Sequence, residues 1–258
     1  MKYLRAFFIA AAMYSRLPVP NVRWDEESKA AVLLLFPLLG VIEGGLVYLA
    51  AVFMLHISAG APLAALCLTA LPLLFTGGIH FDGFLDTADA LGSWKGREEK
   101  LAILKDVHAG SAAVLQGGLM LLAGFAAWLS LLESGNMPER LPQLLPIFLM
   151  SRALSALSIY LLPNARGAGT VYDFTAARAR RKGRLISGFY LFFAAAALFG
   201  AGTLFTGACI LAAVLLAALY SGARAALSFG GMTGDLAGFL LTNCETAGLI
   251  AAALAFRI

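Results

Sequence analysis

Long apolar segments alternate with short polar connections along most of this chain. Seven of the apolar segments are close to the roughly 20 residues that cross the hydrocarbon core of a bilayer. They are Ala31–Leu55, Ala61–His80, Ser111–Leu132, Leu141–Leu162, Leu185–Thr203, Thr206–Phe229 and Leu236–Phe256. The pattern predicts an all-α fold, a polytopic integral membrane helix bundle with about seven transmembrane helices and a range of six to eight.

The N-terminal segment follows a different pattern. Lys2 and Arg5 precede a short apolar run that ends near Met13. Basic anchors beside a short apolar face are typical of a helix that lies in the membrane interface, and this is the structure that we expect. A cleavable signal peptide is the alternative, because Ala10–Ala12 resembles a cleavage site. No internal repeat or linker interrupts the rest, so residues 1–258 are expected to form a single membrane-embedded domain.

The composition supports the membrane interpretation and excludes most soluble folds. Hydrophobic residues make up 60% of the 258 residues and charged residues 13%, whereas soluble domains have about 45–50% and about 25%. The mean hydropathy is +0.84. Three cysteines in apolar stretches, Cys67, Cys209 and Cys244, make neither a disulfide framework nor a metal pattern.

Basic residues predict how the bundle is oriented. Segment Pro163–Arg184 holds six basic residues and one acid, so it should be cytoplasmic. The polar segments Asp82–Gly110 and Gly230–Asp235 lie an even number of spans away and should share that side, whereas Glu133–Arg140 should lie outside. The net charge of +4 thus suits a membrane face better than nucleic acid, and no nucleic-acid partner is expected. Polar clusters on one face favour an enzyme over a channel or transporter.

The strongest chemical signal is a group of aspartates just after the second apolar segment. In a helix, Asp82, Asp86 and Asp89 would stand at i, i+4 and i+7 and share one face. Carboxylates in that arrangement repel one another unless a cation lies among them, and their oxygens suit Mg²⁺ shared with substrate phosphates. A solvated acidic helix start is the alternative. The sequence therefore predicts a magnesium site.

Residues around the aspartates add further candidates. Gly77 and Gly78 would let backbone approach a ligand or a neighbouring helix. His80 is either a general base or phosphate ligand, or an interfacial histidine bonded to backbone. Lys105 and Asp106, at the mouth of the next span, are candidates for a phosphate contact and a metal ligand. The charges before them, from Arg97 to Lys100, are interpreted as a solvated helix face.

Five more charged residues lie near or inside the predicted spans. Arg166 could hold a phosphate, and Asp235 could act in the site or cap the last helix. Glu245 lies about three turns into the bilayer, where ionisable groups mark functional sites by default. Glu43 is equally deep, and Arg152 is the buried cation that would pair with an acid. An acid–arginine pair that holds the bundle together is the structural alternative. The residues alone thus indicate a membrane enzyme of phosphoryl or nucleotidyl transfer.

Taken in order, the motifs resemble the cobalamin (5′-phosphate) synthases, also called adenosylcobinamide-GDP ribazoletransferases. The resemblance runs nearly end to end, and its most specific part is the Thr76–Asp89 stretch. The other blocks are Arg16–Pro20, Phe36–Gly40, Lys105-Asp106 with Gly110, Ser151-Arg152, Arg166 with Gly167 and Gly169, and Gly234-Asp235 with Glu245. The chain departs from the family pattern at Glu43, His108, Leu241 and Thr242.

The resemblance implies the last assembly step of adenosylcobalamin, at the bacterial cytoplasmic (inner) membrane with the active site facing the cytoplasm. Adenosylcobinamide-GDP would be joined to α-ribazole, or to its 5′-phosphate, with Mg²⁺ as cofactor and release of GMP. It implies Mg²⁺ on the three aspartates and a base at His80 or Asp106. It also implies phosphate contacts from Lys105, Arg152 and Arg166, and a metal or ribazole contact from Asp235 and Glu245.

Two other functions remain open at this stage. A CDP-alcohol phosphotransferase also holds a metal on membrane aspartates, but Asp82-Gly83 lacks the Ala-Arg that its pattern requires. An ion-coupled transporter would explain Glu43, Arg152 and Glu245, but not three aspartates at the membrane mouth. Membrane lipid is an expected partner of the basic cluster Arg178–Arg184. The glycine- and alanine-rich spans would also permit a homo-oligomer.

Overall fold

A computed structural model of the chain describes residues 1–135, 137–167 and 177–257; Gly169 and Asp173 lie outside the described residues. The described residues form helices and no strand. The helices are α1 (Lys2–Tyr14), α2 (Glu26–Lys29), α3 (Val32–His56), α4 (Ala61–Thr76), α5 (Ile79–Gly92), α6 (Arg97–Ile103), α7 (Ser111–Leu132), α8 (Met137–Arg140), α9 (Leu145–Leu161), α11 (Ala177–Gly200), α12 (Leu204–Arg224) and α13 (Gly234–Ala255). A 3₁₀ turn, Leu141–Leu144, joins α8 to α9, and a π-helical turn, Ala225–Phe229, ends α12.

Six helices are long and apolar enough to cross a membrane, and they confirm the all-α, multi-pass bundle. They are Val32–His56, Ser111–Leu132, Met137–Leu161, Arg180–Gly200, Leu204–Phe229 and Gly234–Ala255. A seventh span is counted only if α4 and α5 are taken as one broken helix. The predicted range of six to eight spans therefore holds.

The predicted second span, Ala61–His80, is wrong at its end. Helix α4 stops at Thr76, and α5 starts at Ile79 at an angle of 95° to it. Both residues of the corner are glycines with left-handed backbone angles, φ 65° at Gly77 and 80° at Gly78. Side chains disfavour this conformation, so two adjacent glycines let the chain turn sharply without strain. His80 consequently belongs to α5.

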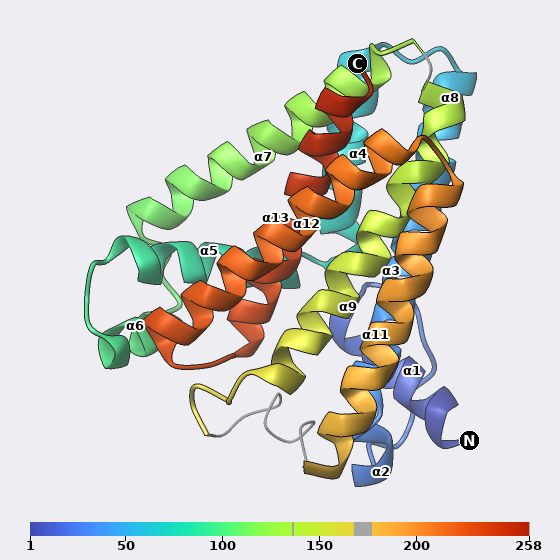
Figure 1. Cartoon of the computed structure of the whole chain (residues 1–258). Coiled ribbons are helices and arrows are strands. Elements are labelled where there is room, and N and C mark those ends of the chain that lie inside the picture. Colours follow the sequence, from blue (N-terminus) through green and yellow to red (C-terminus); the bar gives the residue numbers. More distant parts are fainter. Residues whose placement is uncertain (136, 168–176, 258) are drawn as a thin grey trace.

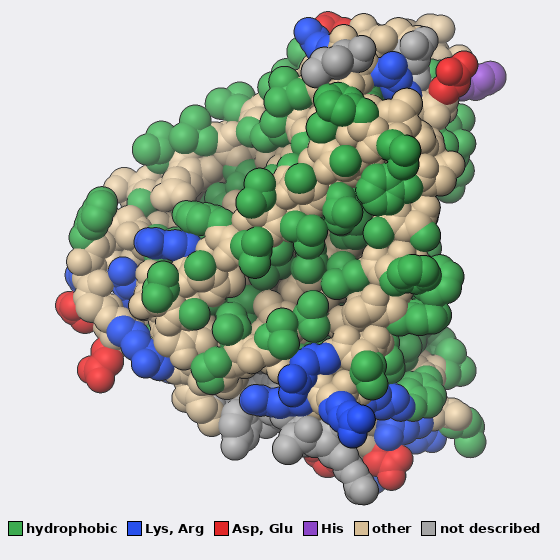
Figure 2. All heavy atoms as spheres, in the orientation of Figure 1, with side chains coloured by type: hydrophobic (Ala, Val, Ile, Leu, Met, Phe, Trp, Pro, Cys, Tyr) green, Lys and Arg blue, Asp and Glu red, His purple; other side chains and the backbone are tan. Residues whose placement is uncertain are grey.

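The polar connections gather at one end of the bundle, as the charge pattern predicts. Figure 1 shows the start of α3, the end of α9 and the turn between α12 and α13 at the lower end, with the connections after α3, α7 and α11 at the upper end. Figure 2 shows hydrophobic side chains over the middle of this face and Lys and Arg gathered mainly below it. Helix α1 packs against α3 at the lower end and buries Ala6, Ile9, Ala10 and Ala11.

Helix α13 is the centre of the bundle and contacts α5, α7, α9 and α12. Its contact with α5 is close because both helices carry a glycine there. A Cβ on Gly83 would lie 2.7 Å from the carbonyl oxygen of Asp235, and one on Gly238 would lie 2.8 Å from that of His80. Small residues of this kind let membrane helices approach backbone to backbone. The contact fixes α5 against the start of α13.

Replacing Gly83 by alanine is expected to lower the thermal unfolding temperature in detergent. The new methyl group would meet backbone atoms that cannot move without displacing α5 or α13, and such overpacking costs about 1–3 kcal/mol. Gly118→Ala on α7 is the matched control, because nothing lies within 4 Å of its Cβ position. Equal unfolding temperatures for the two variants would contradict the close α5–α13 contact.

Candidate active site

The aspartates of α5 share one face of the helix, as their spacing predicts. Asp82 is exposed, and Asp86 and Asp89 are half-buried. The charge of Asp86 is repelled by Asp82, Asp89 and Asp235 and attracted by Arg166. Four carboxylates from two helices therefore act on one small region at the polar end of the bundle. Their mutual repulsion is the physical basis for expecting a cation there.

Arg166 ties this region to two other segments. Its Nη2 donates to Asp235 Oδ2 at 3.2 Å and to the carbonyl oxygen of Leu104 at 3.3 Å. Thr233, and not Asp235, caps α13, because its hydroxyl accepts from the backbone N–H of Leu236 at 3.2 Å. The Thr233 hydroxyl also lies 3.3 Å from Asp235 Oδ2, to which it donates. The carboxylate of Asp235 is therefore held in the site.

Two turns position Arg166 and the start of α13. The backbone N–H of Met232 donates to Pro163 at 2.7 Å, and that of Ala165 donates to Met232 at 3.0 Å. The Asn164 side chain accepts from the N–H groups of Arg166 (2.9 Å) and Gly167 (2.7 Å). The glycine-rich turn Gly230–Gly234 thus pairs with the exit of α9, and this pairing cannot be seen from sequence spacing.

Lys105 and Asp106 lie in the exposed connection between α6 and α7. Asp106 accepts from Nδ1 of His108 at 2.8 Å and from its backbone N–H at 3.0 Å. These hydrogen bonds, led by the one from the His108 side chain, lower the pKa of Asp106. Gly110, at the end of this connection, lies directly against the Asp89 carboxylate, which leaves no room for a Cβ. The connection therefore reaches the face of α5 that carries Asp82, Asp86 and Asp89, which we call the aspartate face. Asp106 itself is paired to His108.

His80 lies on a different side of α5 from the aspartates, and its role as a base or phosphate ligand stays a prediction. It precedes Asp82 by two residues, or about 200° around the helix. Its ring packs on Tyr14 and Phe36, with ring centroids 5.8 and 5.6 Å away, and only 8% of the residue is exposed. The Nε2 atom is buried and has no hydrogen-bond partner among the described residues.

Arg152 and Glu245 form a buried ion cluster with Glu43. Arg152 bonds Glu43 through Nη2 and Glu245 through Nη1, the latter at 2.7 Å. The Ser151 hydroxyl donates to Glu245 at 2.8 Å. The arrangement is the acid–arginine alternative considered from the sequence, with two acids for one cation. Arg152 thus already has carboxylate partners, which leaves it little capacity to neutralise a phosphate.

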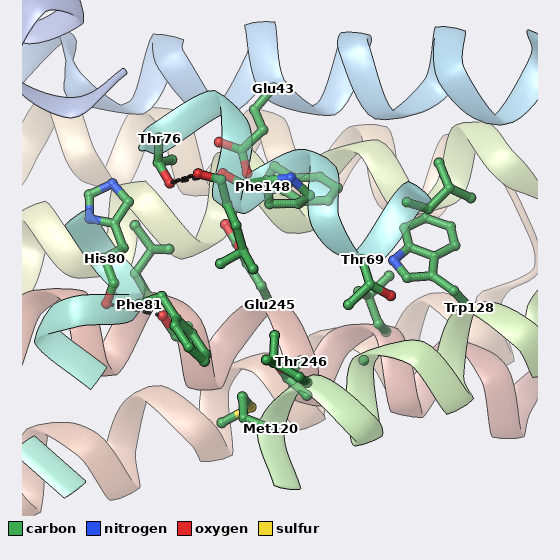
Figure 3. Close-up of a pocket in the computed structure, with 18 of the residues that line it drawn as sticks. Glu43, Thr69, Thr76, His80, Phe81, Met120, Trp128, Phe148, Glu245 and Thr246 are labelled. Carbon is green, nitrogen blue, oxygen red and sulfur yellow. Dashed lines mark hydrogen bonds between the residues drawn. The ribbon is translucent and has the colours of Figure 1, made fainter. Parts of the chain in front are cut away.

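A cavity of about 80 Å³ adjoins the ion cluster. His80 lies near one end of it and Trp128 near the other, with Glu43 and Glu245 between them (Figure 3). Glu43 Oε1 is buried and unpartnered among the described residues. The cavity therefore lies beside the ion cluster, and none of the three aspartates of α5 lines it.

Two arginines at this end of the bundle were not among the predicted site residues. The guanidinium of Arg16 lies against Gly77, and that of Arg97 lies against Gly230, so that a Cβ at either glycine would collide with it. Gly78 has open space around its Cβ position. The sequence placed Arg97 on a solvated helix face, because nothing in local spacing shows that Gly230 comes beside it. Both arginines are exposed.

The donor set of the aspartate face suits the predicted magnesium ion only together with other ligands. Within the described ranges, no group of three His, Cys, Asp or Glu side chains is gathered closely enough to hold a metal ion alone. The aspartate face nevertheless presents only carboxylate oxygens, with one arginine among them. Magnesium is usually held by one or two carboxylates together with substrate phosphates and water. The residues fit an ion that arrives with a phosphorylated substrate.

Comparisons with known proteins place the chain in one family. A family model described as cobalamin-5-phosphate synthase matches residues 6–253. A Lachnoclostridium phytofermentans protein is 35% identical over 95% of this chain and 92% of its own, and a Pseudomonas fluorescens protein is 37% identical over 96% and 99%. A Clostridium botulinum protein is 30% identical over 97% of each chain. All three are named adenosylcobinamide-GDP ribazoletransferase. No solved structure matches this chain.

Proposed function

This chain belongs to the cobalamin-5-phosphate synthase family, and from that premise we propose that it joins adenosylcobinamide-GDP to α-ribazole, or to its 5′-phosphate, and releases GMP. The observation that carries the proposal is the aspartate face of α5. It places several carboxylates and Arg166 at one polar end of a membrane bundle. A diphosphate ester bound with Mg²⁺ supplies the charge and the oxygen ligands that this face lacks.

Asp82, Asp86 and Asp89 would hold Mg²⁺ against the diphosphate. The ion, when bound, would neutralise charge that develops on the phosphate oxygens. Asp235 would support the same site from α13, where Thr233 and Arg166 fix its carboxylate. At the glycine corner before α5, the Arg16 guanidinium lies against Gly77, whereas Gly78 has open space around its Cβ position.

Cations around the aspartates would bind the phosphates that the ion does not reach. Arg97 is the first residue of α6, Lys105 lies in the connection after α6, and Arg166 lies in the connection after α9. Arg166 is shared with Asp235, so Lys105 and Arg97 are the cations with no carboxylate partner among the described residues. A guanidinium and an ammonium next to the diphosphate would favour departure of GMP.

The reaction itself is a displacement at phosphorus. The ribazole hydroxyl oxygen forms a bond to the phosphorus attached to cobinamide, and the bond from that phosphorus to the bridging oxygen breaks. GMP leaves with the bridging oxygen and the second phosphate. Asp106 would take the hydroxyl proton. Because hydrogen bonds from His108 lower its pKa, it is a weak base, which suits a phosphoryl transfer that depends mainly on positioning and charge.

The basic residues indicate which side of the membrane carries the site. Lys182, at the start of α11, donates to the Tyr3 hydroxyl at 2.7 Å and lies over its ring, which joins α1 to the basic cluster. Such clusters attract anionic headgroups of the cytoplasmic leaflet. We therefore place the site on the cytoplasmic side of the bacterial inner membrane, with membrane lipid in contact with this cluster.

The proposal is tested with purified protein in liposomes. Adenosylcobinamide-GDP, α-ribazole and Mg²⁺ are supplied, and cobalamin and GMP are followed by chromatography. Equal amounts of the two products are expected, with none after EDTA treatment and recovery when Mg²⁺ is restored. Product formation that is unaffected by chelation would contradict the magnesium site. A folded protein that makes no cobalamin would contradict the function, and CDP-alcohols would then be tested as substrates.

A further inference from the structure

The charges of the buried ion cluster do not cancel. Arg152 on α9 bonds Glu43 on α3 through Nη2 and Glu245 on α13 through Nη1. Of the described residues that line the adjoining cavity, Arg152 is the only Lys or Arg. Two carboxylates and one guanidinium leave one negative charge in excess, and an uncompensated charge is costly inside a membrane bundle. The cluster therefore needs a further positive partner.

Each of the two carboxylates has one oxygen that is not used in the cluster. Arg152 donates to Oε2 of Glu43, and Oε1 of Glu43 is buried with no partner among the described residues. Both hydrogen bonds to Glu245, from Arg152 at 2.7 Å and from Ser151 at 2.8 Å, go to its Oε1, so its Oε2 is left over. The two carboxylates are held by one guanidinium and line the same cavity of about 80 Å³. Their unused oxygens are thus available to one small ligand.

A proton on Glu43 would remove the excess charge but not the missing contact. Oε2 already accepts from Arg152, so the proton would sit on Oε1. The O–H formed there would be a buried donor without an acceptor in the described part of the chain, which is itself costly. A cation on Oε1 supplies both the charge and the contact. A monovalent ion makes the cluster neutral, whereas a divalent ion would leave one positive charge in excess.

The end of α4 also favours a cation in this cavity. Helix α4 stops at Thr76, and the chain bends there by 95° into α5. Pro72, Leu73 and Thr76, from the last turn of α4, line the cavity, and Figure 3 shows Thr76 on the same side of it as Glu43. The C-terminal end of a helix carries partial negative charge, and broken membrane helices bind cations at such ends.

Thr76 also supplies a neutral oxygen. Its hydroxyl donates to the Pro72 carbonyl at 2.8 Å and accepts from the Gly78 N–H at 3.3 Å. A hydroxyl oxygen has two lone pairs, so one is left for a further contact. Carboxylate and hydroxyl oxygens are the hard ligands that suit cations without a preference for nitrogen or sulfur.

We propose that this cavity binds one small monovalent cation, Na⁺ or K⁺, between Glu43, Glu245 and the Thr76 hydroxyl. The ion joins α3, α4 and α13, and the cavity leaves room for water molecules that complete its coordination. It neutralises the cluster and holds the end of α4 in place. The site is separate from the predicted magnesium site, because no aspartate of α5 lines the cavity. The inference goes beyond the proposed function and does not depend on it.

The test measures ion binding on the full chain in detergent, with EDTA present so that no divalent ion takes part. Radiolabelled Na⁺ is followed by equilibrium dialysis in choline chloride, and unlabelled K⁺ is added as competitor to tell which of the two ions binds more tightly. One ion per chain is expected. At ten times its dissociation constant, the preferred ion should raise the thermal unfolding temperature by about 3–6 °C over choline at equal ionic strength.

Variants locate the ion. Glu43→Gln keeps the volume and leaves Arg152 paired with Glu245, so it should fold, bind the ion at least tenfold more weakly and lose the thermal shift. Glu133→Gln, at an exposed position after α7, is the matched control and should behave like the parent. Asp86→Asn should also bind like the parent, because its carboxylate belongs to the aspartate face.

Three results would overturn the ion site. The first is a parent that binds neither ion and unfolds at the same temperature in choline, Na⁺ and K⁺; if that temperature changes only with pH, a proton neutralises the cluster instead. The second is binding that is lost in Asp86→Asn and kept in Glu43→Gln, which would place the ion on the aspartate face. The third is parental affinity in Glu43→Gln. If Glu43→Gln does not fold, Thr76→Val keeps both carboxylates and takes its place, and parental affinity in that variant would overturn the site equally.

Discussion

Replacing Asp86 by asparagine is expected to slow cobalamin formation by about 10²–10³-fold, the range found when one preorganised electrostatic contact to a reacting centre is removed. Asp86 is the aspartate whose charge is influenced by all three other carboxylates of the site and by Arg166. Asparagine keeps the volume and the helix but removes the charge. The variant should therefore fold and lose the ability to bind Mg²⁺ with the diphosphate.

The measurement compares turnover at saturating substrates over a range of Mg²⁺ concentrations. Glu98→Gln on α6 is the control, because it removes an exposed carboxylate from the same end of the bundle and should leave turnover unchanged. Thermal unfolding gives a second readout. Since Asp86 is repelled by its neighbours, Asp86→Asn is expected to be at least as stable as the parent. Active sites often lower the stability of a fold in this way, so the variant would lose activity without losing stability. Parental turnover in Asp86→Asn would remove the aspartate face from the mechanism.

The class of fold could be predicted because it depends on segment length and apolar content alone. Six of the seven predicted spans correspond to helices that can cross a membrane. The α4–α5 corner could not be predicted in the same way. The apolar run continues to His80 through Gly77 and Gly78, and a hydropathy pattern does not show that both glycines take left-handed angles. The direction of α5, and with it the side on which each residue lies, depends on the tertiary contact with α13.

The candidate site was predictable where one helix carries it and less so where several segments meet. The i, i+4, i+7 spacing is enough to place Asp82, Asp86 and Asp89 on one face. The contact of Arg166 with Asp235 joins segments 69 residues apart, and no local pattern contains it. The same reason explains why the approach of Arg97 to Gly230, and the packing of His80 on Tyr14 and Phe36, could not be predicted.

Replacing Arg152 by methionine is expected to lower the free energy of unfolding by about 3–5 kcal/mol, the cost of removing one partner from a buried ion pair. Arg152 and Glu43 are 1% and 0% exposed, and Arg152 bonds both Glu43 and Glu245. Methionine fills much of the space but leaves two acids facing one another without a cation. Chemical unfolding in detergent should show the loss, whereas Arg23→Met, at an exposed position, should unfold like the parent.

A triple variant separates lost packing from unpaired charge. In Glu43→Gln/Arg152→Met/Glu245→Gln all three charges are absent, so no buried carboxylate is left without a partner. If the loss in Arg152→Met comes from unpaired charge, the triple variant should regain most of the stability, since neutral replacements of buried ion clusters are often tolerated. A triple variant as unstable as Arg152→Met would show that the arginine stem packs the core. An Arg152→Met protein as stable as the parent would show that the cluster does not hold α3, α9 and α13 together.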